Sequence, residues 1–468
     1  MRRHLPFLFA ALTLGGAAHS AAGTPAVPSI PAAAAEYVDL ALGNNLGLQG
    51  QTLELDRARA RLAAMRGALQ PRLDLTARYS LADGGRTIDF PTADLLNGAY
   101  RTLNDYLRSQ GQPAAFSPVA NQSIALLRDR EQETKVRLTQ PLYRPEITRG
   151  MRASQAGLAA REAQVAAYKR ELRLTVLTAY FGCLQAEAAV RILDNAAELT
   201  AEAWRVNREL RAADRITDDR VLRAEADDLA VRQQRAEAER DRHAARNYLN
   251  FLLNRDLDAA IVLPAPAELA SLTLALLGSE PDLAAGVERR EELTALQNSV
   301  VAAAASEAAT RAKLYPTLGL AVEGGVQGAA YRTGAGANFV QGSLVAEVNL
   351  WDGRQQRSAV TEARVDRRRA ELDLEETRLQ LALQLHRASD NFRAAMTSYQ
   401  AAQVRHQALG RAFELVAHRE REGVANQLTF LDARTELTRA ALNEEITRQR
   451  LFTAAAELDR AAALSPLP

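Results

Sequence analysis

The sequence repeats itself, and this duplication constrains its fold more than any other feature. Three segments of the first half recur in the same order in the second half: Ala68–Leu75 is similar to Lys313–Leu320, Gln140–Pro145 to Val348–Gly353, and Leu222–Ala226 to Leu431–Thr435. The first pair is spaced more widely than the other two because the first copy carries about 37 extra residues between its strands. The order and spacing predict two copies of one structural unit.

Each copy is expected to contain a helix, two strands, a very long helix, a tight turn and a returning helix. The first repeat covers residues 23–254 and the second covers residues 291–464, and residues 255–290 form an equatorial linker between them. The predicted strands are residues 71–82, 134–143, 316–326 and 339–351, the long helices are residues 146–213 and 353–421, and the returning helices are residues 217–254 and 427–462.

The two long helices set the fold class. Residues 146–213 and 353–421 contain no internal proline, and about 68 residues at 1.5 Å per residue would span roughly 100 Å. A globular domain has no use for a helix of this length, whereas a tube or a coiled-coil stalk does. We therefore predict a mainly α protein with a small β part.

The predicted strands alternate between polar and apolar residues. In residues 72–81, for example, arginine, aspartate, threonine and serine side chains interleave with leucine, alanine and tyrosine. Strands of a soluble sheet show the same alternation. Four strands of about ten residues in two matched pairs, behind an export signal, favour a membrane barrel. Because roughly eight strands are the fewest that close a barrel, several chains must pool their strands.

The N-terminal residues predict export. Arg2 and Arg3 precede an apolar stretch, Leu5–Gly16, and small residues follow it, which is the pattern of a cleavable signal peptide at residues 1–22. No later stretch approaches 18 uncharged apolar residues, so a transmembrane helix is not expected.

The connections between paired strands differ in length. Residues 82–133 form a long connection in which Thr92–Gln110 can form a short helix, and residues 324–338 form a short, glycine-rich one. On a barrel these two connections would be the outer loops.

Composition and motifs argue against two other classes of protein. A formal charge of +1 gives no basic field for nucleic acid. The six histidines show no metal-binding spacing, and neither a nucleophile motif nor a nucleotide-binding loop occurs. Cys183 lies in an apolar helical run and is expected to pack there. We therefore expect no enzyme, no cofactor and no metal site.

Several of these segments resemble the TolC family of outer-membrane efflux proteins. They are the Leu-x-Pro-x-Leu strand entries at Pro71 and Pro316, the strand exits Pro141–Tyr143 and Asn349–Gly353, and the Phe430–Ala433 run that follows Gly423. The resemblance covers about residues 33–464. It implies a homotrimer with a twelve-stranded β-barrel, four strands per chain, and a long α-helical barrel in the periplasm. The implied partners are a periplasmic adaptor protein, an inner-membrane pump and outer-membrane lipid, in an efflux pump or a type I secretion system.

The resemblance also suggests residues for the periplasmic entrance. The family's Asp-x-x-Asp-Ala pattern is matched by Asp432, whereas Thr429 departs from it. Our hypothesis is that Arg220 or Arg223 pairs with Asp432 across neighbouring helices and helps to hold the entrance closed. The alternative is that these are ordinary solvated charges, since exposed pairs contribute under about 1 kcal/mol.

Two further groups of residues follow from position. The turns between the long and the returning helices are expected to contact the adaptor, and Gly423 suits a helix C-terminus while Thr217 and Asn426 suit N-caps. The turn residues are Arg215, Ile216, Thr217, Gly423, Val424 and Asn426. Tyr143 and Trp351 stand where strands meet helices, so they are candidates for a membrane-interface belt, with plain packing as the alternative.

The leading hypothesis is therefore a passive export duct whose energy comes from an inner-membrane partner. The alternative is an exported coiled-coil structural or adaptor protein of the cell envelope, whose strands would form a soluble sheet.

Overall fold

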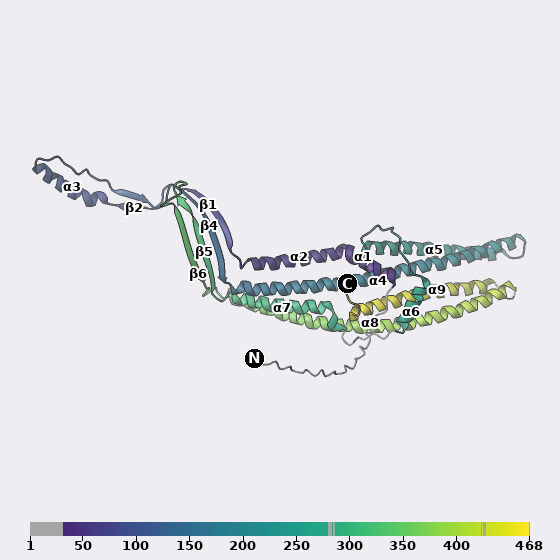
Figure 1. Ribbon diagram of the computed structural model, residues 1–468. Helices are drawn as coiled ribbons and strands as arrows, with labels where there is room; N and C mark the ends of the chain where they lie inside the picture. Colours follow the sequence, from purple (N-terminus) through teal and green to yellow (C-terminus); the bar gives the residue numbers. More distant parts are fainter. Residues whose placement is uncertain (1–30, 279–282, 284–285, 423, 425–426, 468) are drawn as a thin grey trace, which may run out of the picture. The chain divides into compact units, whose positions relative to one another are not determined.

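A computed structural model describes residues 31–278, 283, 286–422, 424 and 427–467 (Figure 1). The signal peptide predicted at residues 1–22 lies outside the described residues. The chain divides into two compact units: unit 1 contains residues 1–55, 161–296 and 373–468, and unit 2 contains residues 56–160 and 297–372. Each unit combines parts of both predicted repeats, and each is described by itself below.

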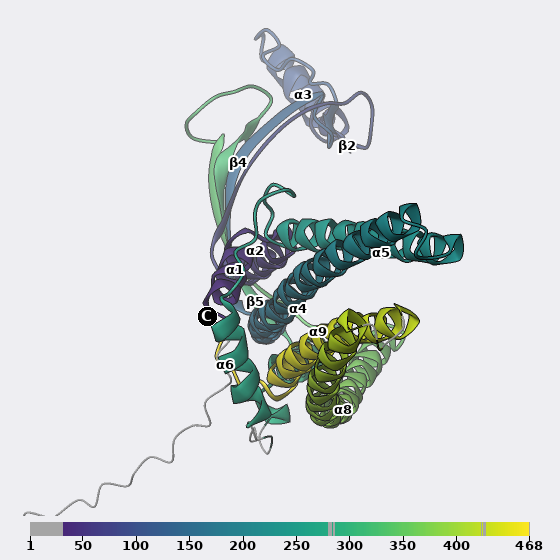
Figure 2. The same cartoon turned by 90° about the vertical axis from the view of Figure 1, so that its right-hand side faces the viewer.

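Helices, of which α4 and α8 are by far the longest, make up most of the described chain. They are α1 (Ala32–Asn44), α2 (Leu46–Gly67), α4 (Pro145–Ala212), α5 (Asp218–Leu252), α6 (Pro266–Leu277), α7 (Glu291–Ala312), α8 (Gln355–Arg421) and α9 (Gln427–Ala462). In unit 1, α4 turns back into α5, and α8 turns back into α9, so that two antiparallel hairpins lie beside the short helix α6 (Figure 2). The protein is mainly α with a small β part, as the sequence predicts.

Apolar residues three or four positions apart build the core of unit 1. Along α4, Leu172, Val176 and Tyr180 are 5%, 0% and 0% exposed, and Phe181 packs its ring 5.2 Å from that of Phe452 on α9. The many alanines of α4 allow close approach of neighbouring helices. One 18-residue window of α4, with a mean hydropathy of 1.3, is apolar enough to cross a membrane, but half of it is buried inside the structure. That burial is typical of a core helix.

Helix α4 is followed by a residue in the left-handed backbone conformation, which begins the turn to α5. Asp214 has a φ of 57°, and the Arg215 N–H donates to the Leu210 carbonyl at 2.9 Å. This six-to-one bond is the hydrogen bond of a Schellman motif, which satisfies a carbonyl that the helix leaves free. At the end of α8 the Val424 N–H donates to the Arg419 carbonyl at 2.8 Å with the same spacing. Both hairpins therefore use the same local hydrogen bond.

Unit 2 contains a four-stranded antiparallel sheet in the order β1-β4-β5-β6. The strands are β1 (Arg72–Leu81), β4 (Arg130–Tyr143), β5 (Thr317–Gly328) and β6 (Asn338–Glu347). Strand β4 begins four residues before its predicted start. Strand β6 ends four residues before its predicted end, because Glu347 already pairs with Thr317, the first residue of β5, and leaves Val348–Trp351 without a partner strand.

The long connection between β1 and β4 has secondary structure of its own. It contains β2 (Thr87–Phe90), α3 (Thr92–Ser109) and β3 (Gln122–Ala125), and β2 pairs with β3 in a separate two-stranded ribbon (Figure 1). The sequence predicts the helix but not the ribbon, because two strands of four residues carry too little alternation to be recognised.

Candidate functional site

The strand register sorts the four-stranded sheet into an apolar face and a polar face. Leu75 pairs with Val136, Val136 with Gly324, and Gly324 with Val340, so these residues form one row across the apolar face. The side chains that share this face are Leu73, Leu75, Ala77, Tyr79, Leu81, Val136, Leu138, Leu320, Val322, Val326, Val340 and Leu344.

The apolar face is exposed in the single chain. Leu75 is 72% exposed, Val340 83% and Leu344 70%. Exposed apolar patches of this extent mark a surface that is covered in the working protein. Four polar side chains of β4 share this face near the ends of the strand, namely Arg130, Gln132, Thr134 and Gln140.

The opposite face carries a ladder of charged side chains across three strands. Arg78 pairs with Glu133 at 3.2 Å, and Lys135 pairs with Glu133 at 2.9 Å and with Glu323 at 3.3 Å. Arg137 also pairs with Glu323. Charged groups on one face and bare apolar groups on the other are the arrangement of a strand pair between water and lipid.

Both edges of the sheet are open in the single chain. Among the described strands, β1 pairs only with β4, and β6 pairs only with β5. In lipid, each unpaired backbone N–H or C=O group costs several kcal/mol, so such edges must find partner strands. Further copies of this chain can supply them, since β6 runs antiparallel to β1.

Aromatic side chains gather at one end of the sheet. Tyr143 ends β4 and is 48% exposed, and Trp351 follows β6 and is 77% exposed. Tyr315, just before β5, stands at the same end, is 45% exposed and lies under the Arg149 guanidinium at 5.3 Å. The sequence reasoning missed Tyr315, although its place two residues before β5 mirrors that of the other two rings beside their strands.

The structure describes four of the six predicted adaptor-contact residues. Arg215, Ile216 and Thr217 form the turn between α4 and α5, and Val424 is exposed. Thr217 holds the N-cap position of α5 with extended backbone angles, but its side chain makes no capping hydrogen bond. Gly423 and Asn426 lie outside the described residues.

The predicted entrance residues are all exposed. Asp432 and Thr429 lie near the start of α9, and Arg220 and Arg223 lie near the start of α5. Within the described part of this single chain, no ion pair joins either arginine to Asp432. The hypothesis of a pair across neighbouring helices stays a prediction.

A buried charged cluster lies close to these residues in sequence, and sequence reasoning missed it. Asp228 on α5 is 2% exposed, accepts a hydrogen bond from the Thr200 hydroxyl at 3.1 Å and pairs with Arg232 at 2.7 Å. Arg434 on α9 is 4% exposed, and its Nη1 has no hydrogen-bond partner. Burial lowers the pKa of Arg434, and the charges of Asp227 and Asp228 partly offset that effect.

The signal for this cluster is present in the sequence. Asp228 continues the spacing of the buried Ala224, and Arg434 continues that of the buried Leu431, so both charges occupy inward positions of their helices. A charge at an inward helix position is the pattern that would have identified the cluster.

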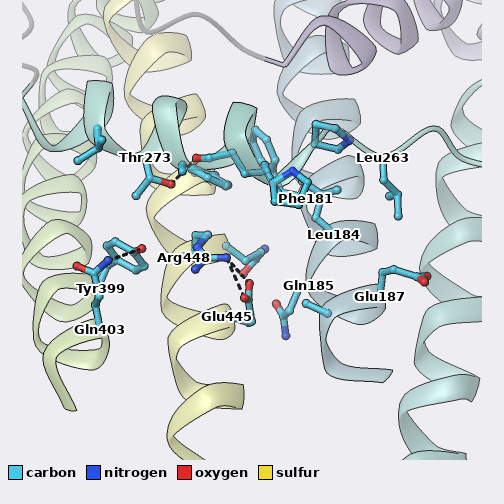
Figure 3. A pocket seen from close by; sticks show the side chains of 18 of the residues that line it. Phe181, Leu184, Gln185, Glu187, Leu263, Thr273, Tyr399, Gln403, Glu445 and Arg448 are labelled. Carbon is cyan, nitrogen blue, oxygen red and sulfur yellow. Dashed lines mark hydrogen bonds and ion pairs between the residues drawn. The ribbon is translucent and has the colours of Figure 1, made fainter. Parts of the chain in front are cut away.

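The equatorial linker covers a cavity in unit 1. A cavity of about 440 Å³ lies between α6 and helices α4, α8 and α9, and is lined by Phe181, Thr273, Phe452 and other, mostly apolar side chains (Figure 3). At its polar end, Arg448 bonds to Glu445 at 2.8 Å and lies over the Tyr399 ring at 5.7 Å. The linker is held in place from the other side, since Tyr37 accepts a hydrogen bond from the Val262 N–H at 2.7 Å.

A second charged network joins the start of α7 to the end of α9 in unit 1. Arg290 is fully buried and forms two hydrogen bonds with the Glu292 carboxylate, at 2.6 and 3.0 Å. It also donates to the Ala461 carbonyl at 3.3 Å, and Arg460 pairs with Glu292 at 3.3 Å. Burial acts to raise the pKa of Glu292, but the hydrogen bonds and charge of Arg290 outweigh it and lower that pKa below its usual value.

Metal-binding geometry does not occur in the part of the chain that the structure describes, where no group of three or more His, Cys, Asp or Glu side chains is placed to hold an ion.

The described fold is one in which strands and long helices come in matched pairs. Residues 286–464 match the family model described as outer membrane efflux protein. A comparison of the sequence with curated proteins gives no match.

Solved structures show the same fold over nearly the whole chain. The Campylobacter jejuni CmeC outer membrane channel is similar with a TM-score of 0.75 and 17% identity, over 93% of this chain and 86% of that one. The open Neisseria gonorrhoeae MtrE outer membrane channel gives 0.73 and 19%, over 92% and 89%. The Vibrio cholerae outer membrane protein VceC gives 0.71 and 15%, over 94% and 98%.

The match over residues 286–464 and the shared fold agree with the resemblance to the TolC family that the sequence suggests.

Proposed function

We propose that three copies of this chain form one export duct through the outer membrane. The observation that carries the proposal is the sheet of unit 2: its apolar face is bare, its other face is charged, and both of its edges are unpaired. Three such sheets joined edge to edge give a twelve-stranded barrel with lipid outside and water inside.

The helices of unit 1 would continue the duct into the periplasm. Hairpin turns such as the one at Arg215–Thr217 would contact a periplasmic adaptor protein, and an inner-membrane pump would supply the energy. Apart from buried residues such as Asp228 and Arg434, the charged groups along α5 and α9 are largely on the helix surfaces, which suits a water-filled passage. Small-molecule efflux and type I protein secretion both fit such a duct.

The exposed apolar face favours the duct over the alternative of an exported coiled-coil scaffold with a soluble sheet. A scaffold of that kind would have to cover Leu75, Val340 and Leu344 with protein, whereas nothing in the described chain covers them.

Tyr143, Tyr315 and Trp351 would then stand at the periplasmic interface of the membrane. Amphipathic rings favour headgroup depth, and all three are at the end of the sheet from which the long helices α4 and α8 continue.

We further propose that Asp432 helps to close the periplasmic entrance by pairing with Arg220 or Arg223 of a neighbouring hairpin. Single-channel recordings in planar bilayers test the duct and the gate together. The wild-type protein should open discrete, trimer-dependent channels of low conductance, and Asp432→Ala should raise the conductance. Thr429→Ala is the matched control, because it removes a neutral side chain one turn away.

The two proposals fail separately in this experiment. Equal conductance of Asp432→Ala and wild type removes the gate and leaves the duct. Absence of any channel in wild-type protein that has inserted into the bilayer removes the duct itself.

A further inference from the structure

The connection between β1 and β4 lacks a core of its own. From Gly84 to Asp129, a range that the structure describes throughout, no side chain is buried. A two-stranded ribbon is marginally stable at best in water, and an isolated helix of 18 residues is little better. Ordering the backbone of about 45 residues costs roughly 1–2 kcal/mol of conformational entropy per residue. This extension therefore needs a surface to pack against.

One face of α3 is already occupied. Asn97 bonds to both backbone groups of Val119, at 2.8 and 2.9 Å, and Asn104, one heptad later, bonds to the backbone of Ala115 and Phe116 at 2.7 to 3.0 Å. The ring of Tyr100 lies 5.3 Å from that of Phe116. The returning segment therefore covers this side of the helix.

A second face of α3 is apolar and uncovered. Leu96, Ala99, Leu103 and Tyr106 repeat with the three-and-four spacing of the a and d positions of a heptad, and we call these four residues the α3 seam. Leu96 is 41% exposed, Leu103 44% and Tyr106 63%, and the neighbouring Leu95 is 73% exposed.

The charged residues of α3 lie on its third face. Asp94, Arg101 and Arg108 occupy the position opposite the seam, and Asp105 stands beside them. No charge flanks the seam, so identical copies would meet there without repulsion. From Gly84 to Leu127 the extension carries three arginines, three aspartates and no lysine.

We propose that the α3 helices of neighbouring chains associate through the α3 seam into a helical bundle outside the shared barrel. This inference rests on the proposed function, because the trimer brings three copies of α3 together. The extension enters directly from β1, the open edge at which the next chain would join. Tethering gives an effective concentration in the millimolar range, which allows a seam of only two heptads to associate.

A lipid surface is the weaker candidate for the occupant of this face. Helices that lie on anionic membranes carry an excess of lysine and arginine on their polar face, whereas the polar face of α3 has two cations and two anions. A heptad seam with outward charges fits a second copy of the same helix.

Cysteine cross-linking of the full-length protein in outer-membrane preparations tests the inference. The wild-type chain is a suitable background, because Cys183 is 6% exposed and burial raises its pKa to about 12. Ala99→Cys and Leu103→Cys place thiols in the seam, and Arg101→Cys places one on the charged face of the same helix as the matched control. Copper phenanthroline is the oxidant, and the oligomer is measured in the same samples by native gel electrophoresis in detergent.

We expect cross-linked dimers from both seam variants, at a yield at least about fivefold above that of Arg101→Cys. Adding Leu103→Asp to Ala99→Cys should lower the yield by about tenfold while the trimer persists, because a charge in the seam opposes association. Leu103 is exposed in the single chain, so this change leaves the rest of the fold intact.

The possible failures are distinguishable. A stable trimer whose seam cysteines cross-link no better than the control overturns the seam and leaves the duct standing, and the face then belongs to lipid or to a foreign partner. An unchanged yield with Leu103→Asp overturns the seam as well. A monomer in detergent overturns both the seam and the proposed duct.

Discussion

Arginine substitutions on the two faces of β1 should show which face contacts lipid and which contacts water. Leu75 pairs with Val136 in the middle of β4 and is 72% exposed on the apolar face, and its neighbour Thr76 points to the charged face opposite Lys135. Leu75→Arg would put a cation near the centre of the bilayer. An arginine there costs about 2–4 kcal/mol in a membrane barrel, and the cost falls to about 0–1 near the interfaces.

The matched control is Thr76→Arg. Its guanidinium would face water and the Glu133 and Glu323 carboxylates that already surround Lys135, so its cost should stay below about 1 kcal/mol. The predicted difference of about 2–3 kcal/mol corresponds to a factor of roughly 30 to 150 in the folding equilibrium constant of each chain.

Urea denaturation of the mature protein, refolded into phospholipid vesicles, measures this difference. The midpoint for Leu75→Arg should fall well below those of the wild type and Thr76→Arg. Equal midpoints for the two arginine variants would refute the assignment of the two faces. Leu75→Arg is expected to be the less stable variant only if Leu75 faces lipid and Thr76 faces water.

Three further results are expected from unit 1. Asp228→Ala should lower the free energy of unfolding by about 3 kcal/mol, because it removes one of the two anions near the buried Arg434 and the buried acceptor of the Thr200 hydroxyl. Arg434→Met should be neutral or stabilising in thermal denaturation, since it removes an incompletely bonded buried cation. Glu292→Gln should destabilise the protein above about pH 4.3. Because the pKa of Glu292 is lowered in the folded state, its contribution is lost as pH falls through that lowered pKa, and the urea midpoints of variant and wild type should converge below it. Cys183 should react with N-ethylmaleimide at pH 8 at least about tenfold more slowly in the folded than in the urea-unfolded chain, as mass spectrometry would show, because burial raises its pKa to about 12.

The sequence predicts the long elements well because their signals are long. The proline-free runs and the duplicated strand entries place α4, α8 and the four strands of the sheet within a few residues of their bounds in the structure. The end of β6 was wrong by four residues, since the length of a strand depends on its partner and Val348–Trp351 has none in β5. The division into repeats stays an interpretation, because the compact units cut across it.

The candidate sites were predicted less completely. Positions at hairpin ends follow from chain order, so the turn at Arg215–Thr217 and the aromatic pair Tyr143 and Trp351 could be proposed without coordinates. Whether a charge is buried depends on which helices meet, and that is why sequence reasoning did not single out Asp228 and Arg434. The three faces of α3 required the path of the returning segment, which short-range patterns do not contain.

The central claim is that strands from several chains close one barrel. Native mass spectrometry of the mature protein, released from detergent micelles, tests it directly. We predict a particle of three chains that dissociates only when β1 and β6 unfold. A stably folded single chain that stays in solution without detergent would contradict it.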